Sequence, residues 1–175
     1  MSNKIKTHQF TQDIPKNADQ INAFLKGTVE QLKQYVPIPD TVENKLRFIL
    51  IELCTNYIKH VPVKNGRFMI EVDEEKIVVK KVQNQYFKGK LLAQLGDRLD
   101  ENAIVEIFFS KSNNHFIKVL GATQFLFLDP LKLDLPTDSL KDHFGLHIIT
   151  LGADEFIYEF DDETQTENFI AKLEL

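Results

Sequence analysis

Apolar residues recur at helical spacing in two stretches of the first half of the chain. Between Asn17 and Val36 they fall three or four positions apart, and Pro37 follows, which predicts a first helix over residues 17–36. A second, more apolar stretch predicts a helix over residues 41–60. Asp40 and Glu43 have capping-box spacing at its start, and Pro62 follows its end.

The other apolar runs predict shorter elements. Short apolar runs bounded by turn residues predict strands at residues 4–10, 68–72, 77–82, 104–109, 116–120, 125–128, 156–160 and 168–175, and the last of these alternates with polar neighbours. Leucine spacing predicts a short helix over residues 91–99, and another is expected over residues 144–151, ended by Gly152. Residues 129–143 have no clear period, and we expect an ordered loop there.

The order of these elements indicates the fold class. A strand, two helices, a hairpin, an irregular middle, a helix and a final hairpin predict an α+β fold. We expect a two-layer sandwich whose helices pack on one face of a largely antiparallel sheet. A chain of 175 residues suits one domain, 1–175, with a divergent central segment at about residues 85–143.

Charge and composition exclude several function classes. The net charge is −5 and the basic residues are scattered, which argues against nucleic-acid binding. No apolar run reaches the length of a membrane span and no secretory signal opens the chain, so we expect no membrane partner and a cytoplasmic location. Cys54, the single cysteine, lies in the apolar helix and is expected to be a core residue rather than a nucleophile.

Candidate chemistry gathers near the end of the second predicted helix. At 100° per residue, Asn56 and Lys59 fall within about 40° of Glu52 and His60 within about 80°, so the four form a polar strip. A carboxylate on a largely buried helix needs partners, so the strip is either a structural network or a site. In the structural interpretation, Asn56 caps a neighbouring loop and Glu52 bonds Lys59 or Arg47.

The pattern of these motifs resembles a known superfamily. Glu52-x-x-x-Asn56 with Lys59-His60 just after, a hairpin, a long variable segment, Gly145-Leu-His-Ile-Ile and a final hairpin together resemble the GHKL superfamily over residues 17–175. This Bergerat-fold group contains gyrase, sensor histidine kinases and the anti-sigma-factor serine kinases.

The resemblance implies roles for individual residues. Asn56 would be the Mg²⁺ ligand that bridges to ATP phosphates, and Glu52 the catalytic base that orients or deprotonates the nucleophile. Lys59 and His60 would lie beside the phosphates. Gly145 and Leu146 would belong to the second glycine box, which opens a helix whose N-terminus faces the phosphates. The implied function is a regulatory protein that binds Mg-ATP and acts on a protein partner, of the anti-sigma serine-kinase type.

One family element is missing. The Asp-x-Gly-x-Gly box expected directly after the first hairpin is replaced by Lys81-Val-Gln-Asn-Gln-Tyr-Phe87, which has neither aspartate nor glycine. An acidic acceptor for the adenine amino group is therefore lacking. The alternative function is a degenerate relative that binds no nucleotide and serves as a protein-interaction module. The sequence leaves a homodimer open, and it shows no metal-ligand spacing around His60 or His143.

Overall fold

The computed structural model describes residues 6–62, 65–96, 100–110, 113–133 and 145–175. The helices are α1 (Ile21–Leu32), α2 (Asp40–His60), α3 (Lys88–Leu95) and α4 (Gly145–Gly152), with short 3-10 turns η1 (Ala18–Gln20) and η2 (Pro130–Leu133). The strands are β1 (His8–Asp13), β2 (Arg67–Val72), β3 (Lys76–Asn84), β4 (Ile104–Ser110), β5 (Asn113–Gly121), β6 (Gln124–Leu128), β7 (Glu155–Asp161) and β8 (Thr166–Glu174).

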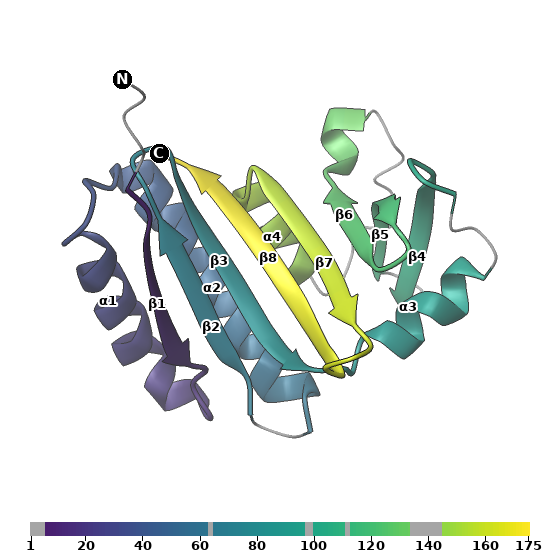
Figure 1. Ribbon diagram of the computed structural model, residues 1–175, viewed down its shortest axis with the longest axis horizontal. Coiled ribbons are helices and arrows are strands. Elements are labelled where there is room, and N and C mark those ends of the chain that lie inside the picture. The colour runs from purple at the N-terminus through teal and green to yellow at the C-terminus, as the bar shows by residue number, and fades with distance from the viewer. Residues whose placement is uncertain (1–5, 63–64, 97–99, 111–112, 134–144) are drawn as a thin grey trace.

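All of these strands belong to one open sheet. Its order is β1-β2-β3-β8-β7-β6-β5-β4, and each pairing is antiparallel (Figure 1). The α+β class and the antiparallel sheet predicted from sequence are therefore confirmed. Because β3 pairs with β8, the hairpin that follows α2 lies directly beside the hairpin that follows α4. Two segments about 90 residues apart in the sequence thus meet at the centre of the sheet.

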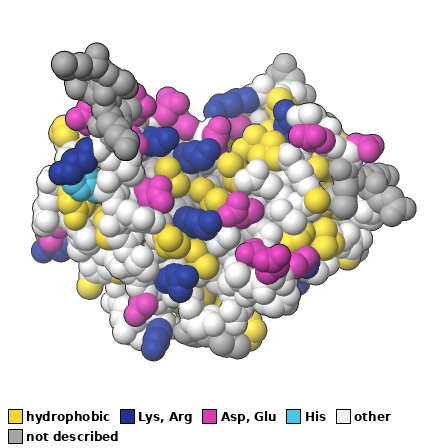
Figure 2. Space-filling view, viewed as in Figure 1, with side chains coloured by type: hydrophobic (Ala, Val, Ile, Leu, Met, Phe, Trp, Pro, Cys, Tyr) yellow, Lys and Arg dark blue, Asp and Glu magenta, His cyan; other side chains and the backbone are white. Residues whose placement is uncertain are grey.

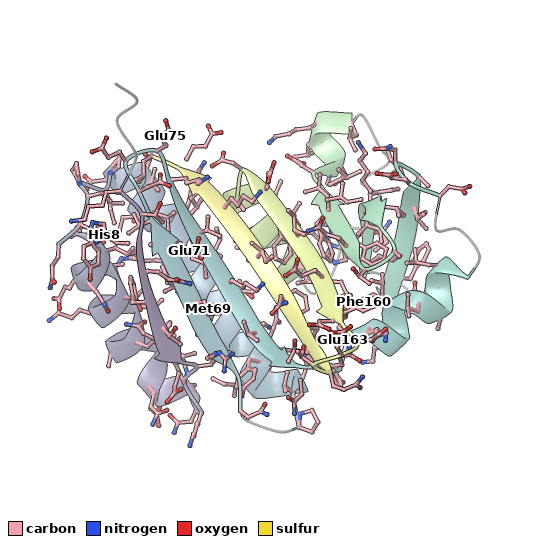
Figure 3. All side chains as sticks on the ribbon, viewed as in Figure 1. His8, Met69, Glu71, Glu75, Phe160 and Glu163 are labelled. Carbon is pink, nitrogen blue, oxygen red and sulfur yellow. The ribbon has the colours of Figure 1, made fainter. Side chains whose placement is uncertain are left out.

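The core forms where α2 and α4 pack on the sheet. Phe68, Ile70 and Val72 of β2 are at most 1% exposed, whereas the alternate residues Met69 and Glu71 point away from this core (Figure 3). This alternation is the period of two that a sheet with one covered face requires. From α2, buried side chains at helical spacing complete the core, and each contributes roughly 1.5–3 kcal/mol by leaving water: Val42, Leu46, Ile49, Leu50, Leu53, Cys54 and Tyr57.

The opposite face of the sheet carries charge. In Figure 2, Lys and Arg side chains alternate with Asp and Glu across this face. Lys80 of β3 pairs with Glu159 of β7 across β8, with Nζ 2.7 Å from Oε1. Such surface pairs contribute little to stability. This face is therefore a solvated surface, and the candidate chemistry lies on the other side. None of the described helices combines the length and the apolar character needed to span a membrane.

The strongest periodic segments are predicted well. Residues 41–60 form α2, which also includes Asp40, and the strands at 68–72, 104–109 and 125–128 are confirmed within one residue. Both terminal strands, β7 and β8, are confirmed with small shifts at their ends. Residues 129–133 contain η2; the rest of the expected loop, residues 134–143, lies outside the described residues, as does Phe144.

Several boundaries are wrong. The first strand is His8–Asp13 rather than 4–10, the first helix ends at Leu32, and α3 spans Lys88–Leu95 rather than 91–99. α3 ends where Gly96 adopts a φ of +54°, a conformation that favours glycine. β3 continues to Asn84, two residues past the expected end, because β8 pairs with its whole length.

The predicted capping box is also wrong. Asp40 is itself helical, and the N-cap residue Pro39 makes no side-chain hydrogen bond. Glu43 instead pairs with Lys33 and with Arg47, its Oε1 lying 2.7 Å from Arg47 Nη2. These two bonds lower the pKa of the Glu43 carboxyl, Lys33 contributing most. The Glu43 side chain thus ties the start of α2 to the end of α1 rather than closing a cap.

Candidate functional site

The predicted site residues line one cavity of about 830 Å³. Glu52, Asn56, Lys59 and His60 reach it from the last two turns of α2, and Gly145 and Leu146 from the start of α4. The polar strip and the glycine segment, far apart in sequence, therefore meet in space. A cavity of this size falls within the range that holds small-molecule ligands and cofactors.

Gly145 touches the polar strip directly. A Cβ placed on Gly145 would lie 2.8 Å from Glu52 Oε2 and 3.4 Å from both side-chain polar atoms of Asn56. A real Cβ atom does not approach an oxygen that closely, so only glycine fits here without moving the Glu52 carboxylate. This contact sets the start of α4 against the carboxylate and the amide of α2.

The Glu52 and Asn56 side chains are half-buried, and both can contact a ligand in the cavity. Within the described part of the chain, neither side chain makes a hydrogen bond or an ion pair. Arg47 bonds Glu43 instead. For these residues, the structural interpretation in which Glu52 bonds Lys59 or Arg47 and Asn56 caps a loop is therefore wrong.

Burial raises the pKa of the Glu52 carboxyl, and the positive charge of Lys59 opposes this shift. A carboxyl whose pKa moves towards neutrality is better suited to exchange a proton with a ligand than an exposed one. Lys59 and His60 are exposed at the end of α2, where they add basic groups to the rim of the cavity. Cys54 faces the core, and burial raises its pKa to about 12, as expected for a core residue rather than a nucleophile.

The opposite wall of the cavity contains residues that were not predicted as site residues. Lys81 and Gln83 of β3 are 3% and 4% exposed and both line the cavity. They continue the buried face of β3 that begins with Ile77 and Val79. Two polar residues at core positions of a strand are unusual. This was the signal in the sequence that could have identified them.

Three further elements add to the lining. It includes side chains from the start and body of α3, one from β4 and one from β8: Tyr86, Phe87, Lys90, Gln94, Phe108 and Phe169. The central segment therefore builds a wall of the cavity and also extends the sheet with β4, β5 and β6.

Glu167 of β8 holds this wall in place. Its fully buried carboxylate accepts hydrogen bonds from the backbone nitrogens of Phe87 and Lys88, at 2.8 and 3.2 Å, from the Tyr158 hydroxyl at 2.9 Å and from Gln83 Nε2 at 2.7 Å. The carboxylate thus bonds backbone N–H groups at the start of α3 and complements the helix dipole. It also fixes which way the Gln83 amide faces.

Among the described residues, no group of three His, Cys, Asp or Glu side chains could hold a metal ion by itself. His143 lies outside the described residues. A divalent ion in this cavity would need ligands from a bound molecule as well as from the protein. A scan against models of known protein families finds no match, and a search of curated proteins finds no relative.

Proposed function

We propose that this chain binds a magnesium nucleoside triphosphate in the cavity between α2, α4 and the sheet, and acts on a protein partner as a cytoplasmic regulator. Mg-ATP is the nucleotide that the resemblance to the anti-sigma serine kinases implies. The observation that carries the proposal is the contact of Gly145 with Glu52 and Asn56 at the wall of an open cavity of about 830 Å³.

The arrangement of elements supports a Bergerat-like, two-layer fold. Helix α2 carries the Glu52 and Asn56 strip and leads into the β2–β3 hairpin, while α4 opens with Gly145 and leads into the β7–β8 hairpin. The two hairpins adjoin through β3 and β8. This places an amide-bearing helix end opposite a glycine-started helix, the pair of features that the resemblance assigns to phosphate binding.

The residues fit a magnesium nucleotide at one end of the cavity. The Asn56 amide oxygen is a hard ligand of the kind that Mg²⁺ accepts, with the rest of the coordination coming from phosphate oxygens and water. Lys59 and His60 at the rim can neutralise phosphate charge, and the first backbone N–H groups of α4 favour an anion. The metal's contribution would be to neutralise charge on the transferred phosphoryl group.

Glu52 is proposed as the catalytic base. Its half-buried carboxylate is unpaired within the described residues, and burial raises its pKa. In this role it would accept the proton from the hydroxyl of a protein substrate as phosphate is transferred.

A second candidate is a protein-interaction module that has lost nucleotide binding. Ile104 and Phe108, 55% and 50% exposed, lie on β4, the last strand of the sheet. Exposed apolar side chains at the edge of a sheet give a partner protein a surface on which to pack, while Gln94 of α3 accepts a hydrogen bond from the backbone nitrogen of Phe108. This surface serves either function, so nucleotide binding decides between them.

A thermal-shift titration of the full chain tests the proposal. A nucleotide at 100 times its Kd adds about 2.7 kcal/mol of stability, so millimolar Mg-ATP or Mg-GTP should raise the melting temperature. Asn56→Ala should abolish the Mg²⁺-dependent part of the shift. Asn44→Ala, at an exposed position of the same helix, should leave it unchanged. The absence of a shift with either nucleotide would leave the interaction module as the function.

A further inference from the structure

The Lys81 ammonium is a buried cation that reaches the cavity without a hydrogen-bond partner. Lys81 is 3% exposed and lines the cavity from β3, and within the described residues its Nζ makes no hydrogen bond or ion pair. In the part of the chain that the structure describes, the buried side-chain atoms that lack a partner and are also sealed from solvent are Gln83 Oε1 and Asn168 Oδ1. Lys81 Nζ is not one of them, so this nitrogen keeps some surface open to the cavity.

The groups nearest to Lys81 leave its charge uncompensated. Nζ lies 4.3 Å from the centre of the Phe169 ring, which attracts a cation but gives its N–H donors no oxygen or nitrogen acceptor. The Glu167 carboxylate also attracts the ammonium, but it forms no ion pair with it and already accepts hydrogen bonds from other donors. Burial outweighs this attraction and lowers the pKa of Lys81 to about 8. A buried charge in this condition is costly, and an anionic ligand would remove the cost.

A single negative charge complements the Lys81 ammonium better than two. One ammonium balances one carboxylate, and its N–H groups can donate to both carboxylate oxygens. A phosphate monoester carries up to two negative charges at neutral pH. Its second charge would lie near Glu167, which is fully buried on the neighbouring strand β8. Repulsion between like charges is strong where water is excluded, so the surroundings of Lys81 favour a carboxylate.

Two aromatic rings determine what the rest of such a ligand must be. Phe87 and Phe169 are largely buried, have ring centres 5.7 Å apart and both line the cavity. A ligand body that packs on these rings leaves water, and this is favourable only where the body is apolar. The combination of one isolated cation with apolar rings therefore fits an organic acid with an apolar body.

We infer that Lys81 forms a binding site for the carboxylate of an organic acid whose apolar body packs on Phe87 and Phe169. The ammonium donates hydrogen bonds to the carboxylate, and the ion pair replaces an unpaired buried charge. The inference goes beyond the proposed function, because none of the residues assigned to the nucleotide belongs to this site. It gives the cavity a second class of ligand, and a failure to bind nucleotide would leave it standing.

An NMR titration of the full chain at pH 7 with benzoate and with benzamide tests the inference. The two probes share one ring and nearly one shape, and they differ in charge. Benzoate should bind at least tenfold more tightly than benzamide and at least tenfold more tightly than inorganic phosphate. Lys81→Met, which keeps the length of the side chain and removes the ammonium, should weaken benzoate binding at least tenfold and leave benzamide binding nearly unchanged.

Lys80→Met is the matched control, because Lys80 is the neighbouring residue and pairs with Glu159 on the opposite face of the sheet. It should change neither affinity. A rise from about pH 7 to about pH 9.5 should weaken benzoate binding at least tenfold, because Lys81 loses its proton near pH 8 while benzoate keeps its charge.

This dependence on pH should disappear in Lys81→Met. Glu167 of β8 and Cys54 of α2 also act on Lys81, and the variant keeps both of them. It also keeps the other titratable residues of the cavity lining: Glu52, Lys59, His60, Tyr86 and Lys90. A dependence that is lost in the variant therefore belongs to the Lys81 ammonium.

Three results would overturn the inference, and each would leave the proposed function intact. Equal affinities for benzoate and benzamide, or benzoate binding unchanged in Lys81→Met, would show that the ammonium does not contact the carboxylate. Phosphate binding as tight as that of benzoate would contradict the choice of a single charge. No binding of benzoate at millimolar concentration would show that water alone satisfies the ammonium.

Discussion

Gly145, the first residue of α4, lies so close to Glu52 of α2 that a Cβ on it would come within 2.8 Å of the carboxylate oxygen Oε2. The contact joins a helix that precedes the first hairpin to a helix that precedes the last one. Because the carboxylate is the far end of a flexible side chain, the fold could accommodate a larger residue by moving it. The glycine is therefore needed for the geometry of the cavity more than for stability.

Gly145→Ala should accordingly weaken nucleotide binding at least tenfold while changing the melting temperature by no more than about 2 °C. The added methyl pushes the Glu52 carboxylate out of place and crowds the Asn56 amide. Calorimetry and a thermal melt on the same sample measure the two effects. Gly152→Ala, at the last residue of α4, is the control, since its Cβ would make ordinary contacts with Ile49 at 3.5 and 3.6 Å. Unchanged affinity in Gly145→Ala would contradict the assigned role.

Lys81→Met should stabilise the free protein. The pKa of Lys81 is about 8 in the folded chain, against an ordinary value of 10.5 when the chain is unfolded, so the unfolded chain binds more protons between these values. The cost of burying the ammonium is fully present below pH 8 and disappears as pH rises to 10.5. We expect a gain of about 1–3 kcal/mol at pH 7, shrinking at higher pH, in urea unfolding. A loss of stability at pH 7 would mean that the ammonium is paired in the native state.

His115 and His147 should make the fold sensitive to acid. Their rings stack at 4.0 Å between β5 and α4, and burial lowers the pKa of both, that of His115 to about 3. In the unfolded chain a histidine binds its proton near pH 6.5, so their contribution to stability is present above that pH and is lost as pH falls towards 3.

His115→Phe should reduce the slope of unfolding free energy against pH between about pH 6 and 4 by up to about 1.4 kcal/mol per pH unit, the value for one proton. Phe127→Leu is the control. It removes the ring that packs edge-on against His115, with the two ring centres 5.9 Å apart, and it changes no titratable group. Phe127→Leu should lower the free energy of unfolding by the same amount at about pH 6 and at about pH 4. Equal slopes in His115→Phe and the parent chain would show that this histidine is not buried in its neutral form.

Glu167→Gln should loosen α3. A neutral amide replaces a carboxylate that accepts bonds from Gln83, Tyr158 and the first turn of α3, and one of its two former acceptors becomes a donor. We expect a loss of about 1–3 kcal/mol and faster hydrogen exchange across residues 88–95. Glu155→Gln, which removes only the exposed pair with Lys172, should leave exchange in α3 unchanged. Protection of α3 equal to that of the parent chain would rule out the anchoring role.

The sequence predicts the outer framework of the fold because its strongest periodicities are local. Helix α2, the β2–β3 hairpin that follows it and the final β7–β8 hairpin are predicted from residue spacing and from the positions of turn residues. The central segment is harder to place, because β4, β5 and β6 pair with one another and join the rest of the sheet only where β6 pairs with β7, a strand about 30 residues further along the chain. Local spacing carries no information about that partner.

The candidate site was predicted in part for the same reason. Glu52 and Asn56 share one helix, so the helical period places them together. The contact with Gly145 required the resemblance, and Lys81 and Gln83 could have been found only by continuing the buried alternation of Ile77 and Val79 along β3. In sequence, Lys81 follows Lys80 and looks like one more surface lysine, although the two point to opposite faces of the sheet.

Nucleotide binding between α2 and α4 is best tested by a crystal structure of the full chain with Mg²⁺ and a non-hydrolysable ATP analogue. We expect the triphosphate between Asn56 and the start of α4, with Mg²⁺ on the Asn56 amide oxygen. A nucleotide bound elsewhere on the molecule, or a cavity that stays empty at millimolar analogue, would refute the proposed site.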